Sequence, residues 1–164
     1  MAYLLRLLTR RDYAAAELDE RLRRKGAPDE VRAAALERLR ELDLIDDARV
    51  AEALVRAGAH RKGRLALRRD LRQRGVDAAA VDAALRPLDD DQQADAARGV
   101  LRKEGWRFAS GDARKDRAKA AGFLRRRGFD GDAVGAALET AFDADGSDPD
   151  DGPSNDVSPG RREP

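Results

Sequence analysis

Three segments of this chain share one spacing pattern, and that pattern limits the folds open to it. In each segment a leucine stands four residues before a glycine, and a second leucine stands ten residues after it. The segments are LRRKGAPDEVRAAAL (22–36), LRQRGVDAAAVDAAL (71–85) and LRRRGFDGDAVGAAL (124–138). Their glycines are Gly26, Gly75 and Gly128, 49 and 53 residues apart. A recurrence of this length is typical of short units stacked in series, so we predict three tandem repeats.

Each repeated glycine marks the predicted end of a helix. A residue just past a helix C-terminus often adopts the left-handed conformation, which glycine reaches most easily. Basic residues precede each glycine, where they favour the negative end of the helix dipole. Asp77 and Asp130 follow their glycines by two residues and are expected to cap the next helix, whereas Pro28 holds that place in the first repeat.

The rest of the pattern is helical as well. Good helix formers dominate, β-branched residues are scarce, and no stretch alternates with a period of two. Apolar residues recur three or four positions apart, which places them on one face of a helix. We therefore predict an all-α protein with nine helices, at 2–11, 14–25, 29–42, 47–58, 63–74, 78–86, 91–105, 112–127 and 131–142. Three helices form each repeat, with repeat one at 1–46, repeat two at 47–88 and repeat three at 89–142, in an elongated array that can curve.

The segment 143–164 has a different composition. It holds seven acidic residues against two basic ones, and four of the six prolines of the chain. Its low apolar content predicts a disordered acidic C-terminal tail. The simplest interpretation is a solubilising end. The alternative is that the tail competes with DNA for basic surfaces elsewhere on the protein.

The composition excludes most catalytic chemistry. Cysteine is absent, His60 is the single histidine, and Ser110 is the only serine before the tail. The segment Gly58–Gly63 has the glycine spacing of a phosphate-binding loop, but Arg64 and Leu65 follow where lysine and a hydroxyl residue are needed. We predict no catalytic, cofactor-binding or metal-binding residues and no enzymatic activity. No apolar run is long enough to span a membrane, so we expect a cytoplasmic protein with no membrane partner.

Charge is distributed unevenly along the chain. Residues 1–142 carry a net charge of +6 and the tail carries −5. In repeat two, the second helix and the loop before it present a broad cationic face with one apolar residue inside it. Repeat three carries a second basic set, whereas Asp19 and Glu20 occupy the corresponding places in repeat one. The candidate binding residues are Arg61, Lys62, Arg64, Leu65, Arg68, Arg69, Arg72, Lys115, Lys119, Arg125, Arg126 and Arg127.

Several interpretations of these basic faces stay open. They can be ordinary solvated surfaces, or they can bind anionic groups, because guanidinium groups bind phosphates and carboxylates with two hydrogen bonds. The partner is then either an acidic protein groove within a nucleoprotein filament or bare nucleic acid. A structural adaptor for another protein is a third hypothesis. The low aromatic content argues against base stacking as the main binding mode.

The order of the motifs resembles the RecX recombination regulators. The resemblance rests on AYLLRLLTRRDYAAAELDERLRRKG (2–26), LIDDARVAEALVR (44–56), KGRLALRRDLRQRGV (62–76) and AAGFLRRRGFDGDAV (120–134). It implies an all-α array of three-helix repeats that binds the RecA filament in its helical groove. It also implies inhibition of ATP hydrolysis and strand exchange by RecA, without enzymatic activity of its own. Single- and double-stranded DNA are further candidate partners, and we expect a monomer.

Two local features carry separate expectations. Ala14 stands where family members often have serine or threonine, so the start of the second helix is expected to be less firmly fixed. Trp106 and Phe108 lie in the longest predicted loop, at 105–112. Their expected role is to cover the neighbouring core, and the alternative is contact with a partner.

Overall fold

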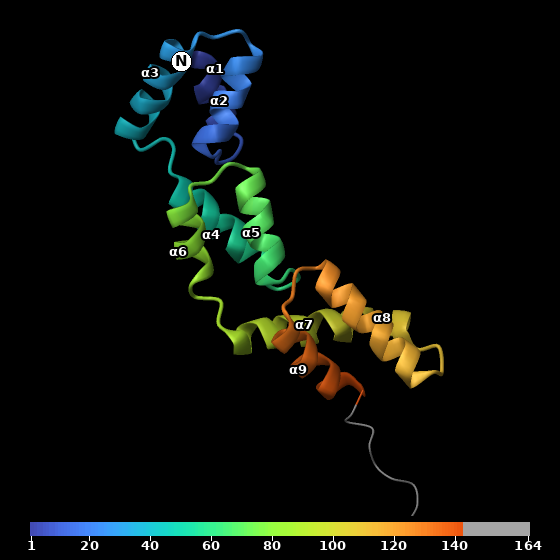
Figure 1. The fold of residues 1–164 in the computed structure, drawn as a ribbon. Helices are drawn as coiled ribbons and strands as arrows, with labels where there is room; N and C mark the ends of the chain where they lie inside the picture. The colour runs from blue at the N-terminus through green and yellow to red at the C-terminus, as the bar shows by residue number, and fades with distance from the viewer. Residues whose placement is uncertain (143–164) are drawn as a thin grey trace, which may run out of the picture.

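The computed structural model describes residues 1–142, and within them nine α-helices and one short 3₁₀ helix account for all of the regular structure. The helices form three consecutive groups that follow one another along an elongated molecule (Figure 1). The first group contains α1 (Ala2–Leu8), α2 (Ala15–Arg24) and α3 (Asp29–Glu41). The second contains α4 (Asp47–Gly58), α5 (Arg64–Gln73) and α6 (Ala78–Leu85). The third contains α7 (Asp90–Glu104), the 3₁₀ helix η1 (Gly105–Phe108), α8 (Ala113–Arg126) and α9 (Gly131–Phe142).

The all-α class and the three tandem groups of three helices are confirmed. The predicted tail, 143–164, lies outside the described residues. Eight helices agree with their predicted bounds to within one residue at either end. The prediction for the first helix was wrong by three residues, because α1 ends at Leu8. The chain leaves that helix early and turns inward, which buries Tyr13 in the core of repeat one and Ala14 in that of repeat two.

The repeated glycines end the second helix of each repeat, as their spacing predicts. Gly26, Gly75 and Gly128 have φ angles of 76°, 71° and 82°, in the left-handed region that favours glycine. The two predicted aspartate caps are present as well. Asp77 accepts a hydrogen bond from the Ala79 amide at 3.0 Å, and Asp130 accepts one from the Ala133 amide at 3.0 Å.

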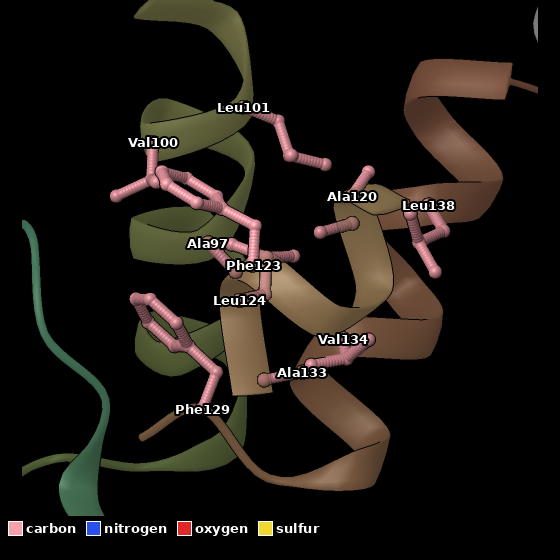
Figure 2. Packing of buried hydrophobic residues seen from close by; sticks show 11 residues of the cluster. Ala97, Val100, Leu101, Ala120, Phe123, Leu124, Phe129, Ala133, Val134 and Leu138 are labelled. Atoms are coloured by element: carbon pink, nitrogen blue, oxygen red, sulfur yellow. The ribbon is translucent and has the colours of Figure 1, made fainter. Parts of the chain in front are cut away.

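Each repeat buries its own apolar cluster. In repeat three, side chains from α7, α8 and α9 converge on one centre, where Leu124 and Phe129 are almost completely buried (Figure 2). Repeat two packs around Leu67 and Leu71, and repeat one around Leu18. Helices contact one another mainly within their own group. The relative placement of the repeats therefore depends on a few residues at the two joints between them.

The joint between repeats one and two places the start of α2 against the glycine turn of repeat two. Ala14 has no exposed surface and packs within the core of repeat two. Asp47 of α4 accepts a hydrogen bond from the Ala15 amide at 2.9 Å and one from the Asp77 amide at 3.2 Å. Glu17 accepts one from the Ala14 amide at 3.1 Å. The expectation of a loosely fixed helix start was therefore wrong, because the next repeat supplies the missing cap.

Candidate interaction surface

The joint between repeats two and three brings the two predicted basic sets together. The amide of Gly63 donates to the carbonyl oxygen of Arg127 at 2.9 Å, and the amide of Leu65 donates to that of Gly128 at 3.1 Å. The start of α5 therefore lies on the turn that ends α8 (Figure 1). A methyl group on Gly63 would stand 2.1 Å from the Gly128 carbonyl oxygen, so only glycine allows this approach.

A buried glutamine completes this joint. The side-chain oxygen of Gln93, a residue of α7 with 1% exposure, accepts a hydrogen bond from the Arg64 amide at 2.7 Å. The guanidinium of Arg64 donates to the Leu88 carbonyl oxygen at 2.7 Å and pairs with Asp90 at 2.8 Å. Arg64 was predicted as a binding residue, but these contacts make it part of the joint. It is half-buried and its charge is already matched.

Five more predicted cations have carboxylate partners within the described residues. Lys62 pairs with Asp70, Arg68 with Asp82 of α6 at 3.1 Å, Lys115 with Asp112 at 3.0 Å, Lys119 with Asp116 at 3.9 Å, and Arg127 with Glu104 at 3.7 Å. Arg127 also lies over the ring of Phe123 at 4.6 Å. The sequence interpretation counted only Asp70 against the arginines of repeat two. It was wrong because Asp82 and Asp90 come from other helices.

The other half of the predicted set remains exposed, and we call it the joint surface: Arg61, Leu65, Arg69, Arg72, Arg125 and Arg126. None of its five arginines forms an ion pair with another residue in the described part of the chain. Leu65 is 58% exposed, and Arg69 and Arg72 follow it on the same side of α5. The carbonyl oxygen of Arg61 accepts a hydrogen bond from Arg127 at 3.5 Å, which places this loop beside the end of α8.

Repeat one differs from this arrangement because its charges are matched locally. Asp19 pairs with Arg32 at 2.9 Å, and Glu20 pairs with Arg23 at 2.7 Å and with Arg24 at 2.8 Å. The hydrogen bonds from Arg23 and Arg24 lower the pKa of Glu20 from 4.5 to about 2. The acidic residues predicted on this face are therefore present, but arginines of the same repeat neutralise them.

A groove borders the joint surface between α4 and α5. It has a volume of about 640 Å³, and Leu54 and Leu67 are among the side chains on its walls. Arg11, Arg61 and Arg74 line it as well. In residues 1–142 no group of three or more histidine, cysteine or acidic side chains could hold a metal ion. No helix described there is long and apolar enough to cross a membrane.

Sequence reasoning missed the residues that hold the joints and misjudged one aromatic. Asp47 and Gln93 carried no signal, because their partners lie about 30 residues away in the sequence. The predicted cover over the neighbouring core is half right. Phe108 packs against Phe123 with ring centroids 5.4 Å apart, but Trp106 is 77% exposed.

Comparison with known proteins identifies the family. Models of the first, second and third three-helix domains of RecX match residues 1–39, 46–85 and 90–138. The chain is 34% identical over 149 residues to "Regulatory protein RecX" of Streptomyces coelicolor, covering 90% of this chain and 79% of that protein. It is 39% identical over 142 residues to the protein of that name from Stenotrophomonas maltophilia (strain K279a), covering 86% and 85%.

Solved structures agree with the fold. The crystal structure of RecX from Lactobacillus salivarius superposes with a TM-score of 0.76 at 23% identity, covering 84% of this chain and 90% of that one. A second crystal structure, of regulatory protein RecX, gives 0.75 at 24% identity, covering 87% and 70%. These likenesses support the arrangement of the helices. Together with the family models and the sequence relatives, they show that the chain belongs to the RecX family of regulatory proteins.

Proposed function

We propose that this protein regulates homologous recombination by binding the RecA nucleoprotein filament and inhibiting its ATP hydrolysis and strand exchange. Membership of the RecX family supports a regulatory role. The settings we assign to it are DNA repair and the SOS response in the cytoplasm. The protein acts as a monomer and performs no catalytic step of its own. We keep 46/47 and 88/89 as the proposed boundaries between its repeats.

The joint surface is the observation that carries the proposal. Its five arginines lack carboxylate partners within residues 1–142 and lie on both sides of one joint. A guanidinium group binds carboxylates and phosphates with paired hydrogen bonds, and both groups occur in a filament of protein and DNA. Leu65 adds an exposed apolar side chain among these charges, which suits an anchor in a protein partner.

An elongated array suits a helical groove. The three repeats follow one another without folding back, so successive repeats can contact successive subunits (Figure 1). Binding across several subunits would oppose the movements that accompany ATP hydrolysis. The same arginines favour a second candidate function, which is direct binding of DNA phosphates without RecA.

One titration separates the two functions. ATP hydrolysis by purified RecA on single-stranded DNA is measured while this protein is added in amounts too small to coat the DNA. We expect inhibition to persist under these conditions, because binding one site can affect a run of subunits. Inhibition that begins only at amounts sufficient to cover the DNA would favour the DNA-binding function.

A further inference from the structure

Trp106 is the most exposed large apolar side chain among the described residues, and the joint surface does not include it. It lies in η1, directly after α7, with 77% of its surface accessible. It is also the one tryptophan in the 164 residues of the chain. An exposed indole needs an explanation, because tryptophan is usually highly buried.

The loop that carries Trp106 is firmly held. Phe108, two residues further on, packs against Phe123 in the core of repeat three. The buried carboxylate of Asp116 accepts hydrogen bonds from the Ser110 amide at 2.6 Å and from the Ser110 hydroxyl at 2.7 Å. The structure therefore fixes both sides of the loop and leaves the indole on the surface.

The surroundings of Trp106 are cationic. Arg102 and Lys103 precede it by four and three residues, are exposed, and have no ion pair within residues 1–142. The guanidinium of Arg107 lies 5.8 Å from the centre of the indole ring. The one acidic neighbour, Glu104, pairs with Arg107 at 3.3 Å and with Arg127 at 3.7 Å, so its charge is matched. Glu104 also ties this loop to the end of α8.

These features favour a nucleic acid over a protein partner. Protein hot spots are desolvated pockets in which apolar side chains gather. In the described part of repeat three, Trp106 has no other exposed large apolar residue beside it. A single aromatic ring among unpaired cations is the arrangement used for single strands, where a base stacks on the ring and cations contact the phosphates.

We propose that Trp106 is a stacking platform for one unpaired base of single-stranded DNA, with Arg102 and Lys103 binding the flanking phosphates. The site extends the proposed function, on which it rests for its biological role, by naming a contact with the DNA itself. The interaction does not require RecA, so it can be measured with the purified protein alone.

The tryptophan fluorescence of the protein reports directly on this site. An oligothymidylate of about 12 nucleotides is titrated against the full chain, and binding is followed in parallel by fluorescence anisotropy of a labelled strand. We expect quenching of Trp106 that saturates together with binding. An abasic strand of the same length carries the phosphates without bases, and we expect it to bind more weakly and to quench little. Equal quenching by both strands, or none at saturation, would overturn the proposal.

Substitutions separate stacking from other roles. Trp106→Ala should weaken oligothymidylate binding by about 5- to 100-fold, to the level of the abasic strand, and Trp106→Phe should restore part of the affinity. Val31→Ala removes a side chain of repeat one that is 57% exposed, and it should change nothing. The melting temperature of Trp106→Ala should match that of the wild type. If this variant binds DNA normally but no longer inhibits RecA, Trp106 contacts protein. The proposal would then be wrong while the proposed function stands. Wild-type protein that shows quenching by DNA but no inhibition of RecA would support the site and contradict the proposed function.

Discussion

Replacing Gly63 with alanine tests the joint between repeats two and three. The backbone at this position has φ −74° and ψ 164°, which alanine adopts without strain. In the absence of a close neighbour, Gly63→Ala would stabilise the protein by about 0.4–1 kcal/mol, because alanine has less conformational freedom in the unfolded chain. The joint predicts the opposite sign.

The magnitude follows from the distances across the joint. The added methyl group would stand 2.1 Å from the Gly128 carbonyl oxygen, whereas ordinary contact begins at 3.4 Å. The joint must therefore open by about 1.3 Å, which breaks the two backbone hydrogen bonds of 2.9 and 3.1 Å. The bond from the Arg64 amide to Gln93 would be lost with them. At about 0.5–1.5 kcal/mol for each bond, the variant should be less stable by about 2–4 kcal/mol.

Urea unfolding followed by circular dichroism measures this effect. In a linear array, loss of one joint should also broaden the transition or split it, because repeat three unfolds more independently. Gly135→Ala is the matched control. This glycine lies inside α9 with open space around it, so alanine should stabilise the protein by about 0.5–1 kcal/mol. A Gly63→Ala variant as stable as the wild type, with an unchanged transition, would refute the reasoning.

Three further predictions concern charge. The pKa of Glu20 is about 2 in the folded protein, so its contribution to stability is present above pH 4.5 and is lost as the pH falls from 4.5 towards 2. An NMR titration of this carboxyl should show the low midpoint and a rise in Arg23→Ala, and a wild-type midpoint near 4.5 would contradict the ion pairs. Combining Arg69→Ala with Arg72→Ala should reduce the salt dependence of oligonucleotide binding by about 0.7 for each lost contact on single strands, and an unchanged slope would exclude both side chains. Removing residues 143–164 should tighten DNA binding at ~50 mM salt, with a gain that shrinks as salt rises. Phe142 lines a cavity with Arg98 and Arg102, so the acidic segment starts beside cations, and binding that is unchanged at every salt concentration would favour a solubilising role.

The helices and their turns were predictable because their signals are local. The spacing around Gly75 and Gly128 and the caps at Asp77 and Asp130 each involve residues close together in the sequence. A helix that ends early, such as α1, was missed because its end depends on burying Tyr13 in the core. Periodicity records which face of a helix is apolar, but it does not record where the chain must turn to cover another helix.

The candidate site was only half predictable for a related reason. A helical projection of α5 finds its arginines but not the carboxylates that reach them from other helices. Asp82 and Asp90 neutralise Arg68 and Arg64, and neither lies on α5. The exposed set emerges only when these pairs are removed.

The central claim is that the joint surface engages the RecA filament, and inhibition of RecA ATP hydrolysis by matched variants tests it most directly. One variant combines Arg69→Ala, Arg72→Ala and Arg125→Ala on the joint surface. The control combines Arg23→Ala, Arg38→Ala and Arg40→Ala, which removes the same charge from exposed arginines of repeat one that already have carboxylate partners. Both proteins should retain the wild-type helical content. We expect the joint-surface variant to need at least about tenfold more protein for half-inhibition, which corresponds to about 1.4 kcal/mol of binding free energy, and the control to stay close to the wild type. Equal loss in the two variants, or wild-type inhibition by both, would contradict the claim.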